Sequence, residues 1–171
     1  ALSGFYVDWL WFKSVGFTDV WSTVLLTKAT LFVAAGLLTS LVISLNIYLA
    51  FRRRPFYVPT SIEADNLERY RATIDPIRKL AFAGIAAVLF YFGGSSATSL
   101  WSSWLLFKTS TPFGVKDPQF GMDISFFAFR LPFLQTLIGW AISTLILATI
   151  ASVAVHYIYG GIRPQVREDR T

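Results

Sequence analysis

The sequence contains no cysteine, and it has only one histidine and one methionine. The lack of cysteine excludes disulfide bonds and thiolate metal sites, although it does not by itself identify a redox compartment. Charged residues make up only 15% of the chain, whereas hydrophobic residues make up 54%. This balance excludes an ordinary water-soluble domain and predicts a chain that is largely in contact with lipid.

Catalytic and phosphate-binding patterns are also lacking. Residues 109–131 offer no Ser/His/Asp arrangement, and Gly114 and Gly121 do not make a phosphate cradle. Asp117 and Asp123 are candidates for a cation site if further oxygen ligands come from elsewhere, but Asp117 stands before a proline and is more simply a turn residue. We therefore predict no enzyme activity, no cofactor and no metal site in this chain.

What the sequence does contain is a set of long apolar runs. The clearest is uncharged from Ala29 to Phe51. At a rise of about 1.5 Å per residue, a helix of this length measures about 34 Å, which is enough to cross a hydrocarbon core of about 30 Å. We predict an all-α, multi-pass transmembrane bundle in which residues 1–171 are part of one transmembrane domain. The complete spans are expected at about 20–51, 77–101 and 132–159.

The boundaries of these spans follow from caps, glycines and prolines. The run from Leu2 to Phe12 is expected to be the end of a helix that begins earlier. The second span either continues to Trp101 or Phe107 or breaks at Gly93 and Gly94. The aromatic piece from Ile124 to Phe129 is expected to lie on the outer membrane surface rather than to cross it.

Basic residues predict the orientation. Ten of the fifteen Lys and Arg residues fall in the segments 51–80 and 160–171, and the positive-inside rule places such segments in the cytoplasm. This gives a basic cytoplasmic loop at 52–76, an outer interfacial loop at 102–131 and a cytoplasmic C-terminal end. Six basic residues are predicted to contact lipid head groups: Arg52, Arg53, Arg54, Arg78, Lys79 and Arg163.

The net charge of +5 raises the question of nucleic acid. No basic stripe is interleaved with exposed aromatic residues, and most of the basic residues adjoin apolar segments. Membrane lipids are therefore the expected partner, and nucleic acid is not.

Polar residues in the first complete span share one side of the helix. At about 100° per residue, Lys28, Ala35, Thr39 and Asn46 fall in a narrow sector. Such a stripe is expected to face protein, because Asn and Thr can hydrogen-bond between helices while lipid offers them nothing. Helix packing and a permeation path both remain open. Lys28 is interpreted either as a gate or buried ion pair, or as a snorkelling side chain near the outer surface.

Small residues mark two further candidate packing faces. Gly36, Ser40 and Ser44 follow one another at four-residue spacing, as do Ala83 and Ala87. Small side chains at this spacing let helix backbones approach closely.

His156, the only histidine, lies about one turn from the inner end of the third span. It is interpreted either as a proton relay or as a hydrogen-bonded interfacial residue.

Four stretches resemble an uncharacterised bacterial family of large multi-pass membrane proteins, uncharacterised protein family 0182. They are Trp9-Leu-Trp-Phe-Lys-Ser-Val-Gly-Phe17, Asp117-Pro-Gln-Phe-Gly-Met-Asp-Ile-Ser-Phe-Phe-Ala-Phe129, Leu131-Pro-Phe133 and His156-Tyr-Ile-Tyr-Gly-Gly-Ile-Arg163. The resemblance implies an inner-membrane protein with around seven spans and a large extracytoplasmic domain after them. This chain would then cover the end of the first helix through the fourth. The resemblance supplies no activity and no catalytic residues to carry over.

From these observations we expect a structural or assembly component of a bacterial envelope complex. Its partners are expected to be membrane lipids, the remaining helices of the same protein or other membrane subunits. The alternative is a component of a transporter or channel. A third possibility is an envelope enzyme whose chemistry lies wholly in the extracytoplasmic domain.

Overall fold

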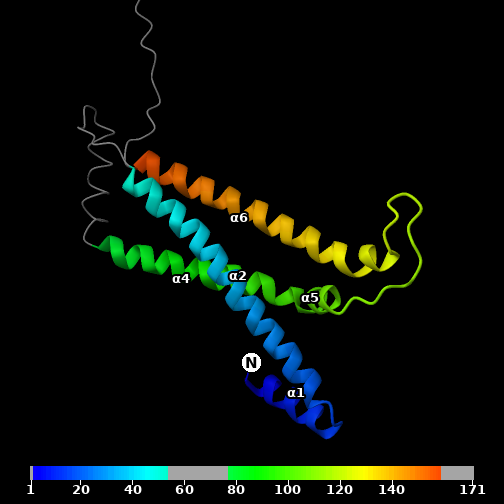
Figure 1. Ribbon diagram of the computed structural model, residues 1–171. Helices are drawn as coiled ribbons and strands as arrows, with labels where there is room; N and C mark the ends of the chain where they lie inside the picture. The colour runs from blue at the N-terminus through cyan, green and yellow to red at the C-terminus, as the bar shows by residue number, and fades with distance from the viewer. Residues whose placement is uncertain (1, 54–76, 159–171) are drawn as a thin grey trace, which may run out of the picture. The chain divides into compact units, whose positions relative to one another are not determined.

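The computed structural model describes residues 2–53 and 77–158, and most of this part of the chain is helical. The elements are α1 (Leu2–Ser14), α2 (Thr18–Arg52), α4 (Arg78–Ala97), a 3₁₀ turn (Thr98–Leu100), α5 (Trp101–Lys108), a π-helical turn (Phe126–Arg130) and α6 (Leu131–Ile158) (Figure 1). The described residues form no strand, only an isolated bridge between Lys116 and Asp123. The all-α prediction is confirmed.

Three helical stretches are long and apolar enough to cross a membrane: Thr18–Arg52, Lys79–Lys108 and Phe126–Ile158. They correspond to the three predicted spans. Helices suit such runs because each backbone N–H and C=O is then bonded within its own segment, with no need for water. The first span ends at Arg52, just before the proline that disfavours further helix.

The second span runs through its glycines rather than breaking there. Both Gly93 and Gly94 are buried within α4, and a 3₁₀ turn leads directly into α5. The alternative in which the helix breaks at the glycines is therefore wrong. A glycine that is packed against a neighbouring helix gains contacts that offset its low helix propensity.

The third span starts earlier than the sequence predicted. Phe126–Arg130 is a π-helical turn that continues into α6, with the Leu131 amide donating to the Phe126 carbonyl. The aromatic piece predicted to lie on the outer surface is therefore mostly helix. The irregular loop is reduced to residues 109–123, and Figure 1 shows it as a chain that leaves α5 and returns to the π turn.

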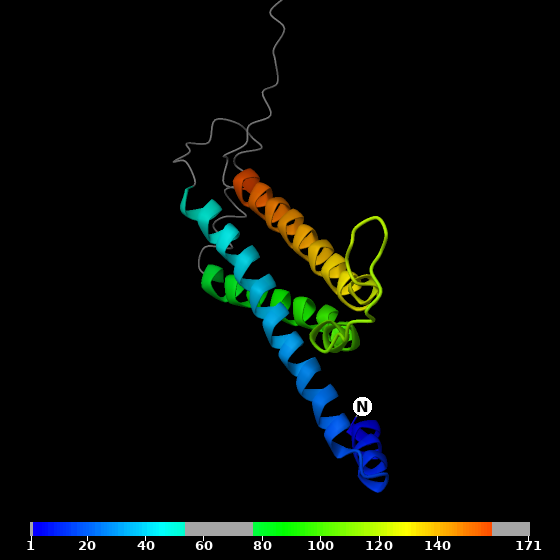
Figure 2. The ribbon, with the colours of Figure 1, turned by 45° about the vertical axis from the view of Figure 1, so that its right-hand side comes forward.

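The chain divides into two compact units, each with its own small core. Residues 1–38 and 90–139 form one unit, in which Ala97 and Phe133 are buried. In this unit α1 folds back beside the start of α2 (Figures 1 and 2), and the Phe5 and Trp21 rings lie 5.0 Å apart. Residues 39–89 and 140–171 form the other unit, in which Ile43, Ala50 and Ala148 are buried.

Several predictions concern residues outside the described part. They are most of the basic loop 52–76, the last residue of the third span, Arg54 and Arg163.

Candidate functional site

Two glycines mark the closest approach of α2 and α4. A Cβ atom added at Gly36 would lie 2.6 Å from the carbonyl oxygen of Phe90, and one added at Gly94 would lie 2.6 Å from the carbonyl oxygen of Phe32. Both glycines are buried. Each helix therefore contributes one glycine against which the backbone of the other helix packs. Only a residue without a side chain fits at these two positions.

The same two phenylalanines complete the contact. The ring of Phe90 lies over Gly36 and the ring of Phe32 lies over Gly94, each within 3 Å of the added Cβ position. The two rings meet edge to face at 5.4 Å, the geometry that aromatic pairs prefer. We call Phe32, Gly36, Phe90 and Gly94 the reciprocal lock.

Sequence reasoning named Gly36 but missed the other three members of the lock. The available signal was a repeated spacing: a phenylalanine precedes a glycine by four residues in both helices. In a helix these positions share one face, so the phenylalanine of one helix can cover the glycine of the other.

A hydrogen bond joins the same two helices in the second unit. The Ser40 hydroxyl donates to the Ala86 carbonyl oxygen at 2.9 Å. Ser44 is buried, and its hydroxyl has no partner among the described residues. Ser40 thus makes the close helix contact that its small-residue spacing predicts.

The second predicted small-residue face is not at this contact. Ala83 and Ala87 are both exposed in the described structure, whereas Ala86 is half-buried. One residue along a helix turns the side chain by about 100°, so Ala87 points well away from the face that carries Ala86. Four-residue spacing identified candidate faces of α4 but not the one that meets α2.

The polar stripe of α2 is not uniformly buried. Thr39 is buried with no hydrogen-bond partner for its hydroxyl in the described residues, and Asn46 is half-buried. The Asn46 side-chain amide donates to the Val42 carbonyl of its own helix at 2.8 Å. Lys28 is exposed. Within the described residues, the stripe therefore contains one side-chain amide that is hydrogen-bonded, that of Asn46, and one buried hydroxyl without a partner, that of Thr39.

Lys28 contacts an aromatic ring. Its Nζ lies 5.5 Å from the ring centroid of Trp101, at the start of α5. A cation over an indole face is attracted by the ring quadrupole, by about 0.5–1 kcal/mol at an exposed site. This contact suits the interpretation of Lys28 as a side chain that reaches toward the interface.

The other predicted site residues lie near helix ends. His156 is half-buried in the last turn of α6, and Arg52, Arg53 and Lys79 are exposed at the end of α2 and the start of α4. Arg78 is the first residue of α4.

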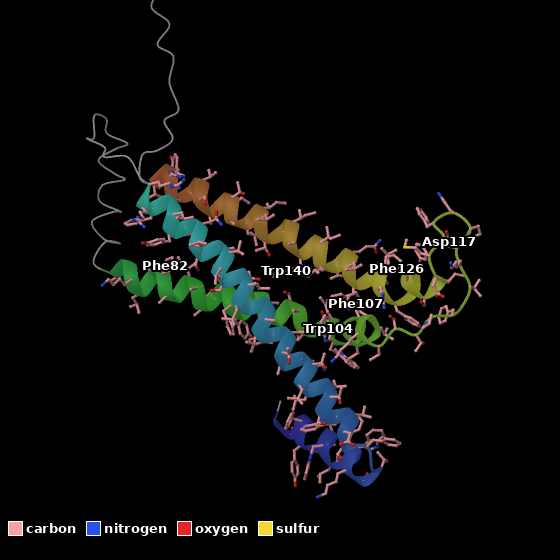
Figure 3. The ribbon with its side chains drawn as sticks, viewed as in Figure 1. Phe82, Trp104, Phe107, Asp117, Phe126 and Trp140 are labelled. Atoms are coloured by element: carbon pink, nitrogen blue, oxygen red, sulfur yellow. The ribbon has the colours of Figure 1, made fainter. Side chains whose placement is uncertain are left out.

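Three aromatic rings join α5 to the start of α6. Trp104 and Phe107 lie together on α5 (Figure 3), with ring centroids 6.0 Å apart. The buried ring of Phe133 lies 5.3 Å from Trp104 and 5.0 Å from Phe107. We call these three residues the aromatic cluster.

Asp123 organises the loop between α5 and the π turn. One carboxylate oxygen accepts from the backbone amides of Phe113 and Ser125, at 3.1 and 2.8 Å, and the other accepts from Gly114 at 2.9 Å. The Ser125 hydroxyl, the largest influence, and these amides lower the pKa of Asp123 from 3.8 to about 2. Sequence reasoning gave Asp123 only a candidate cation role, because the amide donors of Phe113 and Gly114, ten and nine residues away, leave no sequence signal.

This lowered pKa gives a testable pH dependence. The native loop binds fewer protons than the unfolded loop, so its stabilisation by Asp123 is complete above pH 3.8 and is lost as the pH falls toward about 2. We expect hydrogen exchange of the Gly114 and Ser125 amides, corrected for the intrinsic pH dependence of exchange, to be unchanged from pH 7 to 4. The protection should fall below pH 3.8.

An Asp123→Asn variant should lose this protection already at neutral pH, because a carboxamide replaces one acceptor oxygen by a donor. Asp8→Asn removes the same charge from exposed α1 and should change nothing in the loop. Equal protection in Asp123→Asn and the unmodified protein would contradict this role.

A second aspartate shapes the turn itself. One Asp117 oxygen accepts from the amides of Gln119 and Phe120, at 2.9 and 2.8 Å. The Gly121 amide donates to the Asp117 carbonyl, and Gly121 has a φ of 66°, a conformation that side chains disfavour. Asp117 is thus a turn residue, as its position before a proline indicates. No group of three or more potential metal ligands occurs in residues 2–53 and 77–158.

The chain is similar in sequence to known proteins over nearly its whole length. The model of the Uncharacterised protein family (UPF0182) matches residues 1–170. UPF0182 proteins of Thermobifida fusca, Salinispora arenicola and Streptomyces coelicolor are 46, 47 and 44% identical over 98, 96 and 94% of this chain. These matches cover 16, 17 and 16% of the three relatives, so the chain spans about one sixth of their length. No solved structure matches the chain.

Proposed function

The chain belongs to the uncharacterised protein family UPF0182, and on this premise we propose that it is a structural or assembly part of a bacterial envelope complex. In this proposal its three apolar helices cross the inner membrane, with Arg53 on the cytoplasmic side and residues 109–125 outside. In this proposal its residues contribute to helix packing and take part in no catalytic step.

The reciprocal lock is the observation that carries the proposal. Within the first unit, α2 and α4 meet through paired glycines and rings, so packing sets the geometry of this contact. Most of the surrounding helix surface remains uncovered: 17, 17 and 11% of the three apolar windows are buried. A close helix contact with large apolar faces around it suits a scaffold against which lipid or further helices pack.

The proposed role in assembly is tested with the full-length protein. We expect purification of the full-length protein from its native membrane to yield defined membrane partners in constant ratio, identified by mass spectrometry. A Gly36→Leu variant should lose those partners, whereas Gly84→Ala should retain them because a Cβ at Gly84 meets nothing within 4 Å. Isolation of the unmodified protein without partners at constant ratio would overturn the proposal.

The proposed orientation has its own test, helped by the absence of cysteine from this chain. Single cysteines that replace Arg53 and Lys116 should react with an impermeant maleimide from opposite sides of the membrane, because positive-inside bias retains the arginine-rich end. Labelling is measured in intact cells and after permeabilisation. Reaction of both positions from the same side would refute this topology.

A transporter or channel component is the second candidate, favoured by the unpartnered hydroxyls of Thr39 and Ser44. A hydrated path lined by Lys28, Thr39, Asn46 or His156 would give such groups water as a partner. Proteoliposomes with the full-length protein should then pass protons or potassium, and Thr39→Val should reduce that flux without changing assembly. If Thr39 only packs, valine of similar shape should leave stability equal or higher.

A further inference from the structure

The loop between α5 and the π turn folds back on itself as a short hairpin that is held by one isolated antiparallel bridge. The Asp117 amide donates to the Met122 carbonyl at 2.8 Å, and the Ile124 amide donates to the Val115 carbonyl at 3.0 Å. These two bonds flank the bridge between Lys116 and Asp123. The register is therefore fixed, with Lys116 directly opposite Asp123.

This register separates the side chains into two faces. Successive residues of a strand point to opposite faces, so Lys116 and Asp123 lie on one face. Val115 and Met122 lie on the other, together with Asp117, whose carboxylate is bonded to the turn amides. The hairpin is thus amphipathic, with two apolar side chains sharing one face.

The apolar face is uncovered in the described structure. Val115 and Met122 are 56 and 40% exposed, and Phe120 at the turn is 61% exposed. Contiguous exposed apolar residues of this kind mark a binding surface or a membrane contact. A fluid apolar phase suits such an exposed face.

Many backbone amides of the hairpin donate hydrogen bonds. The two aspartates accept five backbone amides, those of Phe113, Gly114, Gln119, Phe120 and Ser125. The ring pairs Phe113–Phe129 and Phe120–Phe127 fasten the loop to the π turn at 5.4 and 5.9 Å. Because an unpaired amide is costly away from water, this bonding lets the loop approach an apolar phase without that penalty.

Chain connectivity then limits which apolar phase is within reach. The loop joins Lys108, the end of one apolar span, to Phe126, the start of the next. Both ends of the hairpin are therefore held where these helices leave the membrane. Lys108, Lys116 and Arg130 add positive charge around it, which complements lipid phosphates.

We propose that the face formed by Val115 and Met122, with Phe120 at its tip, inserts into the lipid interface beside the ends of α5 and α6. The hairpin acts as a rigid interfacial anchor, with Lys116 turned toward head groups and water. This inference rests on the proposed membrane placement of the two spans. It adds a specific lipid-binding surface to that placement.

The test uses full-length protein in vesicles of phosphatidylethanolamine and phosphatidylglycerol, in a background with no other reactive cysteine. A fluorescent NBD label is attached to Met122→Cys, and in a second variant to Val115→Cys. Lys116→Cys, on the opposite face of the same hairpin, is the matched control. Each sample is measured with brominated acyl chains and with aqueous iodide.

We expect the labels at 115 and 122 to lose fluorescence to brominated lipid and to be protected from iodide. The label at 116 should show the reverse. Iodide quenching of all three labels would overturn the inference, because the hairpin would then stand in water. Labels at 115 and 122 that are protected from both quenchers would also overturn it, since protein rather than lipid would cover the face.

The maleimide experiment separates the two proposals. If Arg53 and Lys116 are labelled from the same side, the membrane topology itself fails. If they are labelled from opposite sides and brominated lipid leaves the label at 122 unquenched, only the anchor fails.

Discussion

Replacing Gly94 by alanine is expected to destabilise the α2–α4 pair by about 1–3 kcal/mol, the range typical of overpacking. The added methyl group would lie 2.6 Å from the Phe32 carbonyl oxygen. That atom belongs to the backbone of a long helix, so relief requires the two helices to separate. The measurement is reversible unfolding of the full-length protein in mixed micelles.

Gly84→Ala is the matched control, because it lies in the same helix and a Cβ there meets nothing within 4 Å. It should be neutral or stabilising by up to about 1 kcal/mol, since alanine has the higher helix propensity. Equal losses at Gly84 and Gly94 would mean that glycine matters here for reasons other than close approach.

The reciprocal lock also predicts the effect of substituting Gly36, which the same unfolding experiment measures. Gly36→Ala should cost a similar amount, because its Cβ would lie 2.6 Å from the Phe90 carbonyl oxygen. Once either substitution has pushed the helices apart, the second should cost less than it does alone. The double variant is therefore expected to be less destabilised than the sum, because substitutions at neighbouring sites are not additive.

Phe133→Ala should have the second large effect, a loss of about 3 kcal/mol. Truncation of a buried phenylalanine typically costs about 3–5 kcal/mol, and Phe133 is only 8% exposed. The low end applies because lipid is as apolar as the aromatic cluster, so the lost contacts and the cavity matter more than transfer from water. Unfolding in the same mixed micelles measures it.

Phe92→Ala, at a position 66% exposed on α4, is the control and should change stability by less than Phe133→Ala. A double-mutant cycle between Phe133 and Trp104 should show a coupling of about 0.5–1.5 kcal/mol, the value typical of aromatic pairs. A coupling near zero would mean that the two rings, 5.3 Å apart, stabilise the fold independently.

Much of the helical framework was predictable because it depends on local properties. An uncharged run that ends in arginines and a proline fixes the end of α2 with no reference to the rest of the chain. The starts and ends of the other spans were less certain. The π turn before α6 makes ring contacts with Phe113 and Phe120 of the preceding loop, which the pattern of apolar residues does not reveal.

The sequence by itself determined that the chain is helical, apolar enough to cross a membrane three times and a member of its family. Those properties follow from the length of the apolar runs and from the identity of the residues, and a local stretch of the chain is enough to show each of them. Only the tertiary structure decided that Gly94 rather than Ala83 or Ala87 packs against α2, and that Asp123 holds loop amides. A helix presents several small-residue faces of similar appearance, and the choice among them depends on the side chains of the neighbouring helix.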